Sequence, residues 1–118
     1  MGTSSVMSIY LINDYTSLSG IQDSGEFDIG LFPDGDGYPN VDASKFWMTQ
    51  NTAPTVISGF SCSASYKMII VMINDNNTSF AHGNILLEGG LTMAVQNDDT
   101  IQFAFDGTNW RQIGVAML

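Results

Sequence analysis

The chain has 118 residues, 44% of them hydrophobic, and a formal net charge of −9 from 12 acidic and 3 basic residues. This length corresponds to one small domain, and the apolar content is too high for a disordered acidic tail. Three basic residues are too few to neutralise a nucleic-acid backbone, and no apolar run approaches the roughly 18 residues that a membrane-spanning helix needs. We therefore expect neither nucleic acid nor membrane insertion.

The first half of the chain has the less regular pattern. We expect a disordered lead-in over residues 1–8, where the charged and apolar regions of a secretory signal are missing. The Pro, Gly and Asp residues at 33–42 predict an acidic loop. Residues 42–48 favour one helical turn with Asp42 as its cap. Apolar residues elsewhere indicate strands at 6–12, 15–21 and 26–32.

The second half is broken by turn residues about every eight to ten positions, which is typical of an all-β sandwich or barrel. The run at 68–73 is continuously apolar and, with Lys67 before it, predicts a strand at 67–73 that is covered on both faces. Asp106 and Gly107 predict a hairpin turn between the last two strands. The expected strands of this half are 55–61, 67–73, 78–82, 85–87, 91–95, 100–105 and 110–116.

These patterns predict a single all-β domain over residues 1–118, with a β segment at 9–54 and a core at 55–118. The expected architecture is a small antiparallel, jelly-roll-like β-sandwich. The apolar strand at 67–73 adds more apolar surface than one small core easily covers, so symmetric association is expected to bury the excess. Association multiplies the net charge of −9, so the shared interface should be free of charge and formed by Met, Ile and Val.

Alternate carboxylates in the acidic loop suggest a cation site. Asp34, Asp36 and Asp42 are oxygen ligands of the type that calcium requires. Their spacing differs from an EF-hand because Tyr38 takes the fifth position and no Glu takes the twelfth. A solvated acidic loop without metal is the alternative.

Aromatic residues close to this loop suggest a sugar site. An exposed aromatic ring beside carboxylates and hydroxyls is what a sugar stacks upon, and Tyr38 and Trp47 are the candidates. Core packing is the alternative for both. His82, the only histidine, ends a predicted strand and is a third candidate, although a partly buried hydrogen-bonding role or a place in a trimer interface also fits it.

The sequence predicts no enzyme. No Gly-x-Ser-x-Gly elbow is present, and Asp98 and Asp99 fall where a turn between strands is expected, for which Asp is a preferred residue. Cys62, the only cysteine, excludes an internal disulfide and is expected to be a small core residue.

Three stretches near the end of the chain resemble the C-terminal tip modules of bacteriophage tail fibres and tail spikes. Residues 80–89 read Phe-Ala-His-Gly-Asn-Ile-Leu-Leu-Glu-Gly, residues 98–103 read Asp-Asp-Thr-Ile-Gln-Phe, and residues 106–113 read Asp-Gly-Thr-Asn-Trp-Arg-Gln-Ile. Their order and spacing match the pattern of such modules. The resemblance covers about the last sixty residues and says nothing of the first fifty.

This resemblance implies an all-β module that assembles as a parallel homotrimer at the end of a fibre or spike in the virion. Such modules serve trimerisation and folding, contact with host-surface glycan, or both, and upstream parts of the same fibre or spike are further partners. In some spikes the module is made as a separate product that assists assembly. Alternatives are an assembly chaperone or trimerisation clamp without a ligand, and a small calcium-dependent lectin.

Overall fold

A computed structural model describes residues 28–116 of the chain. The lead-in expected at 1–8 and the strands expected at 6–12 and 15–21 lie outside these residues. The described part is all β: it has two sheets and one short 3-10 turn, Glu88–Gly90, and no helix in it is long and apolar enough to cross a membrane.

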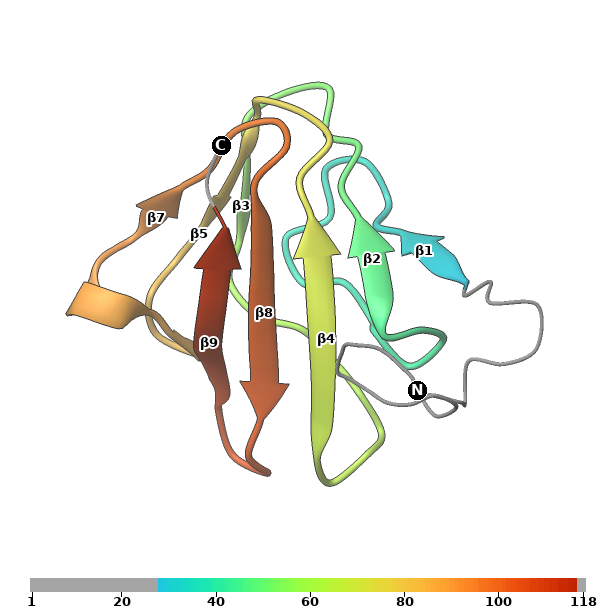
Figure 1. Ribbon diagram of the computed structural model, residues 1–118, viewed down its shortest axis with the longest axis vertical. Helices are drawn as coiled ribbons and strands as arrows, with labels where there is room; N and C mark the ends of the chain where they lie inside the picture. Colours follow the sequence, from blue (N-terminus) through green and yellow to red (C-terminus); the bar gives the residue numbers. More distant parts are fainter. Residues whose placement is uncertain (1–27, 117–118) are drawn as a thin grey trace, which may run out of the picture.

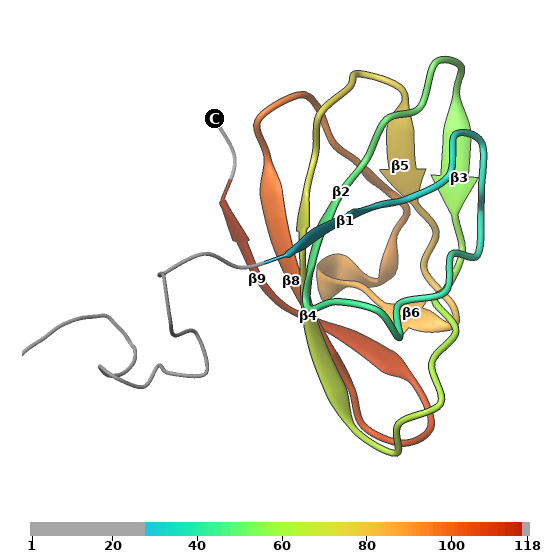
Figure 2. The same ribbon diagram turned by 90° about the vertical axis from the view of Figure 1, so that its right-hand side faces the viewer.

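The two sheets pack face to face, as Figures 1 and 2 show from two directions. One sheet has six strands and the other three. The larger has the order β1 (Ile29–Leu31), β2 (Phe46–Met48), β4 (Lys67–Met72), β8 (Thr100–Phe105), β9 (Trp110–Ala116) and β6 (Ile85–Leu86). The smaller has the order β3 (Thr55–Ile57), β5 (Thr78–Phe80) and β7 (Met93–Ala94).

Both sheets are mixed, so the expectation of a purely antiparallel sandwich was wrong. In the larger sheet β2 is parallel to both of its neighbours, β1 and β4. β8 is antiparallel to both of its neighbours, β4 and β9. In the smaller sheet β5 is parallel to β3 and antiparallel to β7. The reason lies in the connections: the chain visits the other sheet between β2 and β4, and parallel neighbours require such long crossovers rather than hairpins.

The core lies between the sheets, with Phe60 near its centre. The Phe60 ring contacts four other aromatic rings at centroid distances of 5.2 to 6.3 Å, those of Phe32, Phe80, Phe103 and Trp110. The indole Nε1 of Trp110 also donates a 3.0 Å hydrogen bond to the Phe60 carbonyl. Residues from both sheets and from the segment between β3 and β4 thus meet in one aromatic cluster.

The last hairpin forms as the alternation of its residues predicts. β8 and β9 have the expected bounds, and Asp106 and Gly107 lie in the turn between them. The other strands are shorter than expected. Asp98 lies in the expected turn, with a φ of 78° that Asp tolerates, and Cys62 packs against the core although it is only partly buried.

Two expectations about single elements were wrong. Residues 42–48 form no helical turn, because Phe46–Met48 pairs with two strands and becomes β2. β4 is fully buried on one face only, where Ile69 and Val71 lie in the core. On the opposite face Met68 is 52% exposed, and Ile70 and Met72 are partly buried. A continuous apolar run alone does not distinguish a strand covered on one face from a strand covered on both.

Replacing Phe60 with Ala should therefore destabilise the domain strongly. Loss of its ring leaves a cavity among four packed rings, and such Phe→Ala changes cost about 3–5 kcal/mol. Chemical denaturation of the full chain measures this. Tyr66→Ala is the matched control, because the Tyr66 side chain is 75% exposed and its loss should change stability by less than about 0.5 kcal/mol. Equal effects of the two substitutions would contradict the described core.

Candidate functional site

The acidic loop at 33–42 is fastened to the segment between β3 and β4. The Gly37 carbonyl accepts a hydrogen bond from the Ser58 N–H at 2.9 Å, the Pro39 carbonyl accepts one from the Ser61 N–H at 3.0 Å, and the Val41 N–H donates to the Ser61 carbonyl at 2.8 Å. The loop is therefore a fixed part of the sandwich that carries its side chains at defined positions.

The three loop carboxylates accept hydrogen bonds from different partners. Asp34 binds the N–H and hydroxyl of Thr52 at 2.9 and 2.7 Å, Asp36 binds the Tyr38 N–H at 2.9 Å, and Asp42 binds the Ser63 N–H at 2.7 Å. The backbone bond from Thr52 lowers the pKa of Asp34, and that from Ser63 lowers the pKa of Asp42. These side chains hold the loop in place.

This arrangement corrects the expected calcium site. Among residues 28–116 no group of three or more His, Cys, Asp or Glu side chains is placed to hold a metal ion. Asp34, Asp36 and Asp42 each serve a separate turn or backbone contact, whereas calcium requires several oxygen ligands converging on one point.

Tyr38 is the sequence-predicted site residue that presents an aromatic surface. Its side chain is 50% exposed, and its ring lies against Gly59, where a Cβ atom would collide with the ring carbons. The hydrogen bond that the Tyr38 N–H donates to the Asp36 carboxylate fixes the backbone at Tyr38. One side of the ring is thus supported by the sandwich, while about half of the residue remains accessible to a ligand.

Trp47 is not part of such a surface, which corrects its assignment as a sugar-binding residue. It is only 5% exposed, stacks on Phe32 at a centroid distance of 5.0 Å, and donates from Nε1 to the Ser44 carbonyl at 2.9 Å. Gly30, its partner in β1, has no side chain and leaves the room that the indole occupies. Trp47 therefore belongs to the core.

His82 is exposed and has a local structural contact. Its Nδ1 accepts a 3.0 Å hydrogen bond from the Leu87 N–H, which places the ring proton of the neutral imidazole on Nε2. This hydrogen bond joins the chain before β6 to the residue directly after it. The His82 hydrogen bond is to Leu87 and not to the Tyr38 loop, so the structure does not join the predicted site residues into one cluster.

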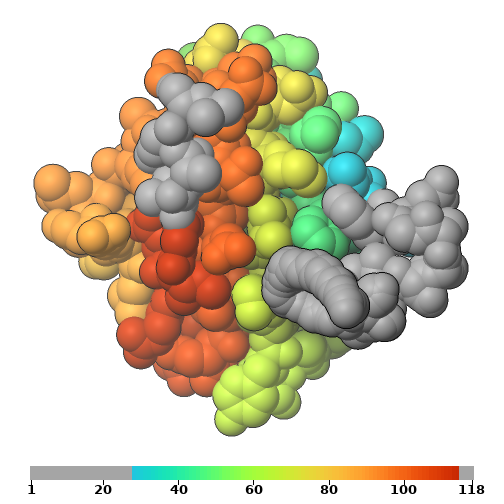
Figure 3. Space-filling view, in the orientation of Figure 1, coloured from blue at the N-terminus to red at the C-terminus, as the bar shows by residue number. Residues whose placement is uncertain are grey.

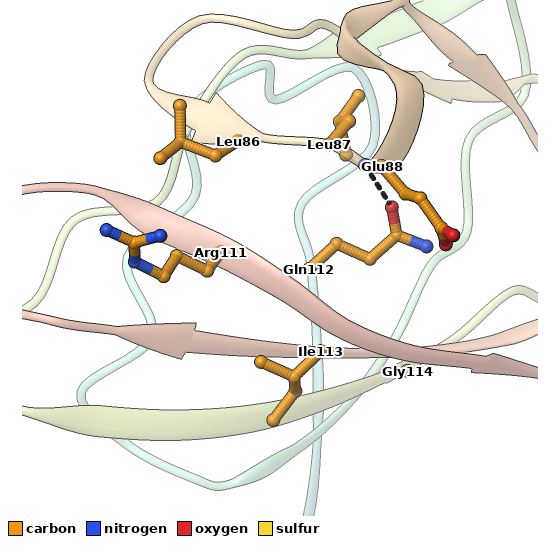
Figure 4. A pocket seen from close by; sticks show the side chains of 7 residues that line it. All are labelled: Leu86, Leu87, Glu88, Arg111, Gln112, Ile113 and Gly114. Atoms are coloured by element: carbon orange, nitrogen blue, oxygen red, sulfur yellow. Dashed lines mark hydrogen bonds between the residues drawn. The ribbon is translucent and has the colours of Figure 1, made fainter.

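A shallow groove that the sequence did not predict lies beside β6. It has a volume of about 420 Å³ and runs between Leu86–Glu88 and Arg111–Gly114 (Figure 4). The Gln112 side chain reaches across it and accepts a 3.0 Å hydrogen bond from the Glu88 N–H. The groove arises because β6 pairs with β9 only as far as Arg111, while Ile113 is an extra residue without a partner in β8.

Asp106 is the most strongly perturbed of the described carboxylates. Hydrogen bonds from the Asn109 N–H, the Arg111 guanidinium and the Thr108 N–H lower its pKa to about 2. Arg111 approaches it at 2.6 Å through Nε. This carboxylate ties the β8–β9 turn to the first residues of β9, next to the groove.

The lowered pKa of Asp106 predicts how stability changes in acid. A carboxyl group with a lower pKa in the folded than in the unfolded state stabilises the fold fully above its unfolded value, 3.8, and loses this contribution as the pH falls towards about 2. Asp106→Asn should therefore lower the melting temperature at neutral pH. It should also reduce the fall in melting temperature that the wild type shows between pH 3.8 and about 2. Thermal melts at a series of pH values measure both.

Thr108→Ala is the control, because it keeps the backbone N–H that donates a hydrogen bond to the Asp106 carboxylate in the same turn. It should leave the pH dependence unchanged. A melting curve of Asp106→Asn with the wild-type decline in acid would show that this carboxylate does not stabilise the turn.

No family model, curated protein or solved structure matches this chain. The chemistry assigned to it therefore depends on its own residues and on the resemblance described above.

Proposed function

We propose that the chain is the distal module of a bacteriophage tail fibre or tail spike, a jelly-roll-like unit of a parallel homotrimer in the virion. One observation carries the family assignment: the three resembling stretches form one contiguous unit. Ile85 of β6 lies beside Trp110 of β9, the Trp110 N–H donates to the Asn84 carbonyl at 3.1 Å, and β8 pairs with β9 along its length. These contacts support treating the three stretches as one structural unit.

Within this proposal, the module binds host-surface carbohydrate at Tyr38. An aromatic ring with one supported and one accessible side suits stacking against the apolar face of a sugar. The exposed residues Asn40 and Asp42 lie two and four positions along the same loop. Besides its bond from Ser63, the Asp42 carboxylate can accept a further hydrogen bond from a sugar hydroxyl. The negative net charge of the chain favours a neutral or amine-bearing sugar over a strongly anionic one.

Within this proposal the module acts by recognition and assembly, and no catalytic role is assigned to the described carboxylates with lowered pKa values. A general acid must hold a proton near neutral pH, which usually requires a raised carboxyl pKa. The pKa values of Asp34, Asp42, Asp75 and Asp106 are all lowered. Their hydrogen bonds to neighbouring groups support structural roles.

Tyr38→Ala should weaken binding to host-surface polysaccharide by about tenfold or more, since a lost aromatic stacking contact is worth on the order of 1 kcal/mol beyond its buried area. A glycan array followed by titration with the glycan it identifies measures this. Gly59→Ala provides a second variant, because its Cβ displaces the ring without removing it. Tyr66→Ala removes an exposed tyrosine elsewhere and should bind as the wild type does. Unchanged binding by Tyr38→Ala would contradict the site.

An assembly chaperone or trimerisation clamp without a ligand is the second candidate, and the exposed apolar face of β4 favours it. It differs from the leading proposal in one outcome: the chain would form trimers and bind no glycan on the array.

Metal dependence separates the proposed module from a calcium-dependent lectin. EDTA and added calcium should leave both the melting temperature and glycan binding unchanged, because Asp34, Asp36 and Asp42 are dispersed among separate hydrogen-bonding partners. Differential scanning fluorimetry and the glycan titration measure this with magnesium as the control ion. A rise in melting temperature with calcium alone would favour the lectin.

A further inference from the structure

The outer face of the six-stranded sheet is the side that points away from the three-stranded sheet. The inner residues of β2 and β4, such as Trp47 and Ile69, are buried in the core, so their neighbours in sequence point outward. The outer positions of β1, β2, β4 and β8 are Ile29, Leu31, Phe46, Met48, Met68, Ile70, Met72, Thr100, Gln102 and Ala104.

The strand register aligns these outer positions into rows across the sheet. Ile29, Phe46, Ile70 and Gln102 form one row, and Leu31, Met48, Met72 and Thr100 form the next. Figure 3 looks onto this side of the molecule, where β2, β4 and β8 lie next to one another. Leu31 and Met68 are 55% and 52% exposed. The outer positions of β1, β2 and β4 therefore form an apolar surface. β8 extends it with Thr100, Gln102 and Ala104, and at its edge β9 adds the exposed Arg111, opposite Ala104.

The outer face is also free of acidic residues in a chain of net charge −9. None of its positions holds Asp or Glu, whereas the described acids lie in loops and turns, among them Asp34, Asp75, Glu88 and Asp106. Two copies of so acidic a chain repel each other at most orientations. They can approach closely with little repulsion where neither presents a carboxylate.

The chemistry of the outer face matches an interface between proteins. Interface centres are depleted in charge and enriched in aromatic residues and Met. Met48, Met68 and Met72 have flexible side chains that adapt to a facing surface. A basic partner would instead be drawn to the acidic loops, so charge favours another copy of this chain as the occupant.

We propose that the outer face is the self-association surface of this chain, and that its occupant is the outer face of other copies of the same chain. The inference rests on the homotrimer of the proposed function and adds the surface through which it forms. Met68, Leu31 and their neighbours meet at the shared interface, while the loop with Tyr38 stays outside it.

Sedimentation velocity of full-length variants tests the surface. Met68→Glu and Leu31→Glu should reduce the assembly to monomer over a concentration range in which the wild type stays associated, since each places a carboxylate in every copy of the apolar interface. Val56→Glu is the matched control, because Val56 is 52% exposed on the smaller sheet and should leave the assembly intact. A wild-type circular dichroism spectrum of the variants confirms that they are folded.

Methionine oxidation with hydrogen peroxide, read by mass spectrometry, gives an independent measurement. Met68 should become protected as the wild-type concentration rises, and this protection should be lost in Leu31→Glu. Met93 lies in the smaller sheet, away from the outer face. Its extent of oxidation should therefore not change with protein concentration.

The outcomes separate this inference from the proposed function. If the wild type associates and both Glu variants associate equally well, another surface joins the copies: the inference fails and the trimeric module stands. If the wild type is a monomer with Met68 protected at every concentration, another part of the chain covers the outer face, and the inference fails. If the Glu variants dissociate but no glycan binds, the inference stands and the recognition function fails.

Discussion

The packing of Phe60 between the two sheets is the interaction on which the rest of the structure depends. Its ring joins residues from β5, β8 and β9, and its carbonyl accepts the indole N–H of Trp110. The neighbouring residues Ser58 and Ser61 bind the acidic loop. The same segment therefore closes the core on one side and fixes the position of Tyr38 on the other.

This dependence explains why a mixed sheet can be stable in so small a domain. β1 and β2 are short, and both are joined to the sheet by parallel pairing across long connections. Their stability comes from the stacked rings of Phe32 and Trp47 and from the hydrogen bonds that hold the crossing loop. The inner positions of β2 and β4 serve this core, whereas Met68 on the outer side of β4 is 52% exposed.

The sequence was most informative where the contacts are local. The alternation at 100–105 and the turn residues Asp106 and Gly107 predicted β8, β9 and their hairpin, because a hairpin is set by its own residues. The acidic loop at 33–42 was predicted for the same reason, because its Pro, Gly and Asp residues are close together in the sequence. The parallel pairing of β1 with β2 was not predictable, since it depends on partners 17 residues apart, Ile29 and Phe46.

The candidate site shows the same limit. Tyr38 lies within the acidic loop and Trp47 shortly after it, and only the three-dimensional arrangement shows that their environments differ. Gly30 makes room for Trp47 in the core, while Gly59 supports Tyr38 at the surface. The loop carboxylates suggested a metal site because their partners, Thr52 and Ser63, lie 18 and 21 residues away. By contrast, the composition predicted an apolar surface of Met and Ile, and the outer face of β4 carries Met68, Ile70 and Met72; whether copies of the chain meet there stays a prediction.

The central claim is that an acidic chain with one acid-free apolar face associates through that face. Sedimentation equilibrium of the wild-type chain at micromolar concentration tests this most directly. The expected mass is near 38 kDa, three times the chain mass of 12.8 kDa. This mass should persist at raised salt concentration, because salt screens the repulsion between acidic copies and does not weaken an apolar interface. A mass of 12.8 kDa at every concentration would contradict it.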